Sequence, residues 1–313
     1  MGKLWIFVNN SGLYKIDMST FKIEDHYTLL TDYEGNSLRT FYIDKKGYIW
    51  FGTIDGIYIF DPTDGKLSHY KHSRTDPFSL PNNSIWEISE DRQSNVWIGT
   101  YSGTLCYVNI DENNAFKTYH PQNSGLNHTP VSAFAEDQQY LWVGTEGGGI
   151  NRMNKATGEF SYITSANSIT SNNIKSLITD AGHNLWISTF MGGLDLYNVG
   201  RQKVTNFKHT KGAPHSLLVN DVRKTILEGD SGMWVAYQYQ KAEVSYFSFR
   251  EESFTHFSLD SISNNSYLFD ILRQGEKTLW AISNETLYRL DIDKHVVEKM
   301  IPNYTTYCGF FTF

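Results

Sequence analysis

The 313-residue sequence is poor in features that would place it in several large protein classes. It has only two cysteines, Cys106 and Cys308, which are too few and too far apart for a disulfide scaffold or a zinc site. No apolar run reaches the roughly 18 residues of a membrane-spanning helix. The net charge of −7 gives no general attraction to nucleic acid or anionic lipid. We therefore expect no nucleic-acid partner and no direct membrane insertion of this chain.

Catalytic and cofactor motifs are also missing from the sequence. The ten histidines lack the H-x-H or H-x₃-H spacing of metal ligands, and the glycine clusters do not form a phosphate-binding or dinucleotide-binding pattern. No G-x-S-x-G nucleophile elbow occurs. Acidic residues such as Glu87 and Asp270 are scattered, whereas a glycosidase needs two converging carboxylates. We predict no catalytic residue, no cofactor and no metal.

Aromatic residues and glycine, by contrast, are abundant and recur with a fixed period. Each repeat has a tryptophan in a short apolar run such as VWIGT, and three further runs separated by turns or polar connections follow it. The runs have the length of strands, and none sustains a helical period. The repeat length is roughly 46 residues, which is in the range of propeller blades. The repeated tryptophans are Trp5, Trp50, Trp97, Trp142, Trp186, Trp234 and Trp280.

Seven repeats of four strands predict an all-β fold, a seven-bladed β-propeller with four-stranded antiparallel blades. The sequence opens on the tryptophan run of its first repeat and closes on a run that has the position of an innermost strand. We expect residues 306–313 to pair with residues 3–8 and to close the ring in blade one, because an open ring leaves unpaired edges. Residues 1–313 are expected to form a single domain.

The repeated residues have architectural explanations. We expect Trp186 and its equivalents to pack between neighbouring blades, and the small residues beside them to let adjacent strands approach. Gly192 and Gly193 supply turn geometry that residues with a Cβ resist. An aspartate just ahead of each tryptophan run superficially resembles the Asp-boxes of sialidases, but its position before a turn favours an Asx turn. These aspartates are Asp44, Asp91, Asp137 and Asp180.

The pattern N-x-[IV]-x-x-[IL]-x-x-D-x-x-G-x-[IL]-W-[IVF]-G-T-x-x-G-[IL] occurs with local variation, for example from Asn83 to Thr100 and from Asn173 to Leu194. It resembles the two-component regulator propeller repeat, and the resemblance covers essentially the whole chain. The resemblance implies a periplasmic sensor region of a hybrid two-component system, typical of gut Bacteroidetes, whose usual ligands are oligosaccharides. In that family two propellers commonly precede a β-sandwich, a membrane helix and a kinase. The chain would then be one module of a larger receptor, with a second propeller or a homodimer partner.

Three repeats depart from the pattern. Blades two to five keep Gly-Thr or Ser-Thr at the end of the tryptophan run, whereas blades six, seven and one have VAYQYQKAE, AISNE and FVNNS. If the ring closes as predicted, these three blades are contiguous. The variant sector is explained either by sequence drift or by a surface reserved for a partner or ligand.

A ligand site is predicted at one mouth of the axial channel, where the inner strands begin. The loops before these strands are rich in Asn, Ser and His, which suit sugar hydroxyls. The position after the apolar anchor of each inner strand carries three cations and a tryptophan, which suit an acidic sugar through guanidinium forks and indole stacking. That position reads Arg39, Trp86, Ser132, Lys175, Arg223, Leu268 and Cys308, and we add Tyr101, Phe190 and Tyr237 from the loops after the tryptophan runs.

The function favoured by these observations is non-catalytic sensing of an oligosaccharide. Two alternatives stay open. Streptogramin lyases are seven-bladed propellers with loosely similar repeats and a histidine at the mouth of the ring, so an enzyme acting on a small molecule or glycan is one of them. A purely protein-interaction scaffold is the other. A membrane helix and a kinase downstream of this chain would decide for the sensor.

Overall fold

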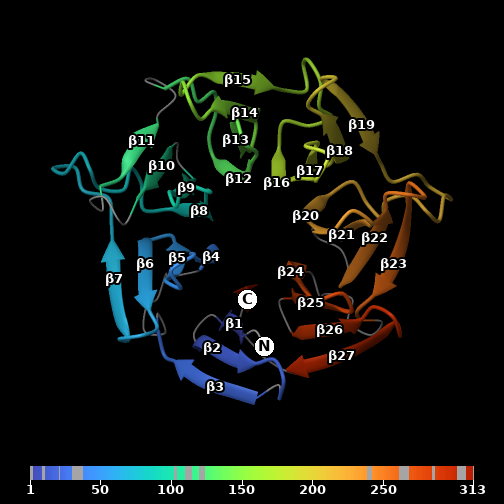
Figure 1. The fold of residues 1–313 in the computed structure, drawn as a ribbon, viewed down its shortest axis with the longest axis horizontal. Coiled ribbons are helices and arrows are strands. Elements are labelled where there is room, and N and C mark those ends of the chain that lie inside the picture. The colour runs from blue at the N-terminus through green and yellow to red at the C-terminus, as the bar shows by residue number, and fades with distance from the viewer. Residues whose placement is uncertain are drawn as a thin grey trace. The chain divides into compact units, whose positions relative to one another are not determined.

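The computed structural model describes residues 3–8, 11–20, 22–29, 38–101, 104–109, 115–119, 124–237, 242–260, 268–283, 286–301 and 308–312. These residues form seven four-stranded sheets whose neighbouring strands pair in antiparallel fashion (Figure 1). No helix occurs in the described parts of the chain. The predicted fold class, an all-β seven-bladed β-propeller with four-stranded antiparallel blades, is confirmed.

The chain divides into two compact units, the first of which contains residues 1–132 and 306–313. It holds blades one to three. From the first to the fourth, the strands of each blade are an inner strand, a tryptophan strand, a third strand and an outer strand. Blade one has β28 (Cys308–Thr312), β1 (Lys3–Val8), β2 (Gly12–Asp17) and β3 (Lys22–Tyr27); blade two has β4 (Thr40–Ile43), β5 (Ile49–Thr53), β6 (Gly56–Asp61) and β7 (Lys66–Tyr70); blade three has β8 (Ile85–Glu90), β9 (Val96–Thr100), β10 (Leu105–Val108) and β11 (Lys117–Tyr119).

The second unit contains residues 133–305 and holds blades five to seven with nearly all of blade four. Blade four has β12 (Val131–Glu136), β13 (Tyr140–Thr145), β14 (Gly149–Asn154) and β15 (Phe160–Ile163); blade five has β16 (Ile174–Thr179), β17 (Leu185–Thr189), β18 (Gly193–Asn198) and β19 (Lys203–Phe207); blade six has β20 (Val222–Glu228), β21 (Gly232–Tyr237), β22 (Glu243–Ser248) and β23 (Ser253–Ser258); blade seven has β24 (Leu268–Gln274), β25 (Thr278–Ser283), β26 (Leu287–Asp291) and β27 (Val296–Ile301).

Blade one is assembled from both ends of the sequence. Strand β28 pairs with β1 in antiparallel register, with Trp5 opposite Thr312 and Val8 opposite Cys308. The predicted pairing is therefore confirmed for residues 308–312, while residues 306, 307 and 313 lie outside the described chain. This pairing gives β1 the inner neighbour that its edge would otherwise lack.

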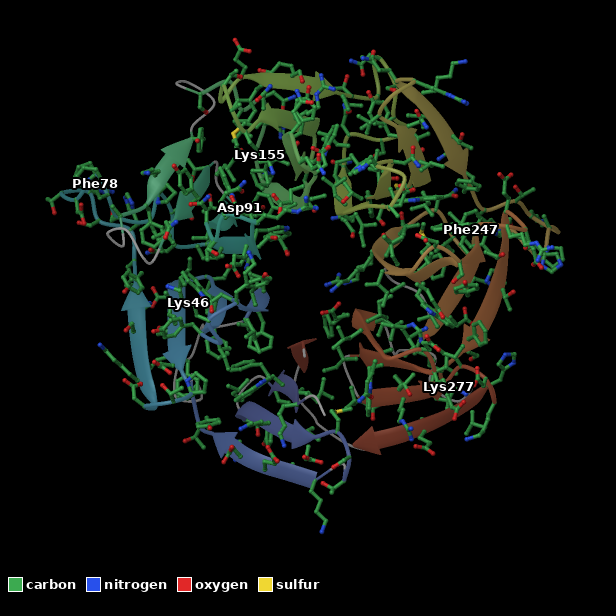
Figure 2. The ribbon with its side chains drawn as sticks, in the orientation of Figure 1. Lys46, Phe78, Asp91, Lys155, Phe247 and Lys277 are labelled. Carbon is green, nitrogen blue, oxygen red and sulfur yellow. The ribbon has the colours of Figure 1, made fainter. Side chains whose placement is uncertain are left out.

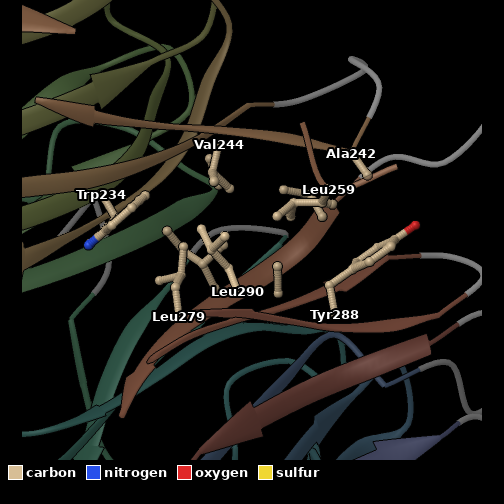
Figure 3. Packing of buried hydrophobic residues seen from close by; sticks show 11 residues of the cluster. Trp234, Ala242, Val244, Leu259, Leu279, Tyr288 and Leu290 are labelled. Atoms are coloured by element: carbon tan, nitrogen blue, oxygen red, sulfur yellow. The ribbon is translucent and has the colours of Figure 1, made fainter. Parts of the chain in front are cut away.

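The tryptophans of blades five and six pack between consecutive blades, as predicted. Trp186 of blade five is 3% exposed and belongs to one cluster with Met233 and Val235 of blade six. Trp234 of blade six packs in the same way with residues of blade seven such as Leu279 (Figure 3). Burial of these indoles contributes hydrophobic stabilisation across each of these blade boundaries.

Two positions of the repeat pattern, one inside the tryptophan strand and one at the turn after it, are occupied by glycine for geometric reasons. A Cβ on Gly144 would lie 2.6 Å from Cγ2 of Ile174, the apolar anchor of the next inner strand. Gly193 has a φ of +86°, and a Cβ there would lie 2.3 Å from the carbonyl oxygen of Phe207. The first glycine is needed for interblade approach, and the second for a left-handed turn that disfavours other residues.

The repeated aspartate makes the predicted Asx turn and one further bond. The Oδ1 atom of Asp91 accepts the backbone amides of Gln93 and Asn95, both at 2.9 Å. Its Oδ2 atom accepts the indole N–H of Trp97 at 2.8 Å. Asp91, labelled in Figure 2, directly follows β8 of blade three. The same indole bond is made by Asp44, Asp137, Asp180, and by Glu228 and Gln274 in blades six and seven.

Candidate functional site

The inner strands carry β-bulges at the positions predicted to bind ligand. In blades three, five and six the register shifts immediately after the apolar anchor of β8, β16 and β20. The extra residue is Trp86, Lys175 or Arg223, respectively. A bulge removes one residue from the regular ladder and redirects its side chain, and bulges are common next to functional sites.

Blade seven requires a correction to the sequence alignment. Leu268 is predicted to occupy the same position, but it is itself the anchor of β24 and is buried at 1% exposure. The register shift lies between Leu268 and Asp270, so the equivalent residue is Phe269. The run Tyr-Leu-Phe has three adjacent apolar residues, so no sequence signal identifies the anchor among them. The same correction applies to Cys308, which pairs with Val8 as the anchor Ile174 pairs with Thr189, so Gly309 is the residue that follows the anchor in blade one. Ser132 is at the predicted position and is buried.

In the first unit, three predicted residues form one cluster. The guanidinium carbon of Arg39 lies 4.8 Å from the ring centroid of Trp86 and 5.6 Å from that of Tyr101. The two rings are 5.3 Å apart and inclined by 36°. The Arg39 amide donates to the carbonyl of Gly52, and the Tyr101 amide donates to that of Ser84. The β5 and β8 ends thus hold the members of the cluster in place.

The cluster presents both a charge and an aromatic face. Tyr101 is 51% exposed, whereas Arg39 and Trp86 are partly buried. Burial lowers the pKa of Arg39, but a guanidinium stays protonated at any physiological pH. Within the described part of the chain, no carboxylate forms an ion pair with Arg39. The guanidinium is therefore available to an anionic ligand group.

In the second unit, the predicted residues form two smaller groups. Lys175 forms an ion pair with Glu146 and lies 5.6 Å from the ring centroid of Phe190. Arg223 donates from Nε to the carbonyl of Phe269 at 2.8 Å and lies over the ring of the same residue. The charge of Lys175 is already compensated by the protein, so the three predicted cations are not equivalent.

Tyr237 differs from the expectation. The sequence pattern predicts a loop position at the channel mouth, but Tyr237 is the last residue of β21 and is 1% exposed. Its hydroxyl donates to Oγ of Ser245 at 2.7 Å, and burial raises its pKa. This side chain packs in the cluster between blades five and six, so we do not include it in the candidate site.

Two of the long loops before inner strands use their polar residues internally. In residues 71–84, Nδ1 of His72 bonds to the carbonyl of Leu80 at 2.8 Å, and residues 208–221 repeat this with His209 and Leu217 at 2.7 Å. The amide of each histidine also bonds to an asparagine side chain of the same loop. Phe78 lies in the middle of the first loop and is 63% exposed (Figure 2). These polar groups stabilise loop structure, and they are not all available to sugar hydroxyls.

Three further observations concern metal sites, membrane-spanning helices and the reactivity of a buried cysteine. No group of three or more His, Cys, Asp or Glu side chains with the arrangement of a metal site occurs in the described residues. None of the described segments is a helix that is long and apolar enough to span a membrane. Burial raises the pKa of the Cys106 thiol, which disfavours its reactive thiolate.

Comparison with known proteins identifies the repeat. Residues 32–55 and 79–102 match the two-component regulator propeller family. Over 225 residues, 67% of this chain, the sequence is 26% identical to histidine kinase P4 of Formosa agariphila, and the match spans 16% of that protein. The chain therefore spans a small part of the length of this curated relative.

Solved structures share the fold. The extracellular domain of a B. thetaiotaomicron protein assigned to a hybrid two-component system has a TM-score of 0.54 and 16% identity, over 97% of this chain and 57% of that one. U3-55K has a TM-score of 0.63 and 9% identity, over 86% of this chain and 82% of that one. Such low identities support the propeller architecture alone. The resemblance predicted from the sequence is confirmed at the level of two matched segments and a shared fold: this chain is a β-propeller whose repeats are similar to those of the two-component regulator propeller family.

Proposed function

We propose that this chain is the ligand-sensing part of a periplasmic receptor and that it binds an oligosaccharide without transforming it. The matched repeats and the similarity to a histidine kinase support a role in signal transduction. The fold shared with an extracellular domain of a hybrid two-component system supports an extracytoplasmic location. Contacts with a second propeller or with a second copy of the chain would transmit the signal.

The observation that carries the ligand class is the cluster of Arg39, Trp86 and Tyr101. Aromatic faces contact the apolar faces of sugar rings, and a guanidinium can bind a carboxylate or sulfate through two parallel hydrogen bonds. The cluster combines both features, and the charge of Arg39 has no protein counter-ion among the described residues. An oligosaccharide with an acidic residue is therefore the ligand that this cluster suits best.

The test is a binding survey with uronate-containing, sulfated and neutral oligosaccharides. We expect Trp86→Ala to weaken binding by roughly tenfold, and Arg39→Ala to weaken binding of acidic ligands by roughly ten- to a hundredfold. Lys175→Ala should have a smaller effect because Glu146 already pairs with Lys175. Tyr162→Ala, which removes an exposed aromatic residue from the outer strand of blade four, is the matched control.

The outcomes separate the sensor from its alternatives. Unchanged affinity in both the Trp86 and Arg39 variants would place the ligand elsewhere. Accumulation of a cleaved or eliminated glycan product would show catalysis and overturn the non-catalytic part of the proposal. A folded protein that binds no glycan and still associates with a second propeller would favour the interaction scaffold.

A further inference from the structure

A cavity of about 250 Å³ lies between blades two and three, away from the Arg39 cluster. Blade two contributes residues from β5, β6 and β7, including Tyr48 just before β5, and Ser68 and Tyr70 on the outer strand. Blade three contributes Val108 from β10 and Phe116 from the segment before β11. All of these residues belong to the first unit.

The lining follows the outer hairpin of blade two from one end to the other. The β6–β7 ladder has five residue pairs, from Ile57 opposite Tyr70 to Asp61 opposite Lys66. Tyr70 and Lys66, at its two ends, both line the cavity, as does Ser68 between them.

The cavity has aromatic walls and polar groups that are not engaged elsewhere. Tyr70 and Phe116 contact each other edge-on, with centroids 6.0 Å apart. Within the described chain, the hydroxyl groups of Tyr48, Ser68 and Tyr70 form no hydrogen bond. They can each donate and accept. A site lined by aromatic surface and unengaged hydroxyls suits a ligand that has both an apolar face and hydroxyl groups.

Charge and size narrow the ligand further. Hydrogen bonds from Thr63 hold the pKa of Asp61 below its usual range, so this carboxylate is ionised, and Lys66 lies opposite it in the ladder. Asp64 also lines the cavity, so the lining holds two carboxylates and one ammonium, which disfavours an anionic ligand. Each carboxylate already accepts a hydrogen bond from the backbone, Asp61 from Thr63 and Asp64 from Lys66. An apolar cavity of about 150 Å³ holds benzene, so this volume accommodates one substituted six-membered ring.

We propose that this cavity is a second subsite that takes a single neutral sugar ring, distinct from the acidic residue bound at Arg39. The ring would lie against Phe116 while its hydroxyls bond to those of Ser68, Tyr48 and Tyr70. The site uses none of the residues of the proposed sensing cluster. The two proposals can therefore fail independently: variants at the cavity test the affinity for neutral sugars, and variants at Arg39 test the affinity for acidic ones.

Ligand-observed NMR titration with methyl glucoside, methyl galactoside and methyl mannoside tests the subsite. Ser68→Phe fills the cavity and should weaken binding of the preferred glycoside by about tenfold or more. Thr205→Phe is the matched control, because Thr205 has the same position in the outer strand of blade five. It should leave the affinity unchanged.

Tyr70→Phe provides a second variant that keeps the packing and removes only the hydroxyl. It should weaken binding about two- to tenfold, the range of one hydrogen bond. Saturable binding that is lost in the Ser68 and Tyr70 variants and kept in the Thr205 variant supports the subsite. No saturable binding of any neutral glycoside, equal effects of Ser68→Phe and Thr205→Phe, or loss in Trp86→Ala alone would overturn it.

Discussion

Blades two to five and blade six differ at the residue that ends the tryptophan strand. In the four regular blades a buried threonine donates its hydroxyl to a carbonyl across the following hairpin, for example from Thr145 to Gly149 at 2.9 Å and from Thr189 to Gly193 at 2.8 Å. Blade six has Tyr237 in this place, paired with the β20 anchor as Thr189 is paired with the β16 anchor. Its hydroxyl bonds to Ser245 instead.

The tyrosine in blade six begins a longer chain of hydrogen bonds. Ser245 bonds at 2.7 Å to Nδ1 of His256 on the outer strand, and Nε2 of His256 lies 3.1 Å from the carbonyl of Pro214. A local link within one hairpin is thus replaced by a link from the tryptophan strand to the loop of residues 208–221. In blade six, the change from threonine to tyrosine at this position changes the partner of the hydroxyl and retains the hydroxyl itself.

Blade seven shows that the three variant repeats are not alike. Ser283 occupies the threonine position and donates to the carbonyl of Thr286 at 3.2 Å, so the hairpin link is kept with a smaller side chain. Blade one has Val8 there, which has no hydroxyl. Blades six, seven and one, which the sequence groups as variant repeats, therefore differ from one another at the threonine position. The loop residues that follow it (9, 10, 238–241, 284 and 285) lie outside the described chain.

The largest expected effect is at the glycine before the regular threonine. Gly144→Val would force a side chain against Ile174 of the next inner strand, where a Cβ alone would lie 2.6 Å from Cγ2. We expect a loss of about 3 kcal/mol or more in the free energy of unfolding, at or above the upper end for an overpacked core. Blade five has Ser188 at the equivalent place, so Ser188→Ala is the control, with an expected change below about 1 kcal/mol. Urea unfolding measures both, and equal losses would contradict the role assigned to glycine.

The threonine link should have the next largest effect. Thr145 donates to Gly149 and accepts the amide of Gly148, and Thr145→Val removes both bonds in a buried site. We expect a loss of about 2 kcal/mol in the free energy of unfolding, since a buried polar group left without its partner costs about 1–3 kcal/mol. Thr205→Val, at a threonine on the exposed face of β19, is the control that should change stability little. A loss in Thr145→Val no larger than in this control would mean that the hairpin does not depend on the link.

Tyr237→Phe tests the hydrogen bond that replaces the threonine link in blade six. The change keeps the buried ring and removes the hydroxyl, which donates to Ser245 at 2.7 Å and accepts the Leu218 amide at 3.5 Å, while Ser245 retains its bond to His256. We expect a loss of about 1 kcal/mol in the free energy of unfolding, mainly from the shorter of the two bonds. Binding of oligosaccharides should be unaffected because the ring lies in the core. A selective loss of ligand affinity with unchanged stability would restore Tyr237 to the site.

The residues that follow the repeat were predictable from the sequence, and those that break it were not. The roles of Trp186, Gly193 and Asp91 follow from periodicity and turn chemistry, which are local properties. The assignment of Tyr237 to a loop failed because burial of its ring depends on strand length in the folded sheet. Leu268 was misplaced by one residue because a bulge shifts the register without a sequence signal. The Arg39 cluster was predicted as a set of positions, but the pairing of Lys175 with Glu146 depends on side-chain geometry.

The smallest expected effect is on the pH dependence of stability, which should differ between the threonine links and the link of blade six. The regular links contain only hydroxyl and peptide groups, whereas that of blade six contains His256. Burial lowers the pKa of His256; the hydrogen bond to the Pro214 carbonyl and the charge of Glu243 oppose this effect, and His215 reinforces it. In the neutral ring, Nε2–H donates to Pro214 and Nδ1 accepts from Ser245, so protonation removes the acceptor that Ser245 uses.

The sign of the pH dependence follows from which state binds the proton more readily. Because the folded pKa of His256 is lowered, the unfolded chain is protonated first as pH falls, and this group's contribution to stability decreases below about pH 6.5, the ordinary value for histidine. Thermal unfolding at pH 7.5 and pH 5.5 should therefore show a smaller pH-dependent decrease in His256→Gln than in the unchanged protein. His209→Gln is the control, because it changes a loop histidine outside this chain of bonds. If His256→Gln has the same pH dependence as the unchanged protein, the titration of His256 does not distinguish blade six from the regular blades.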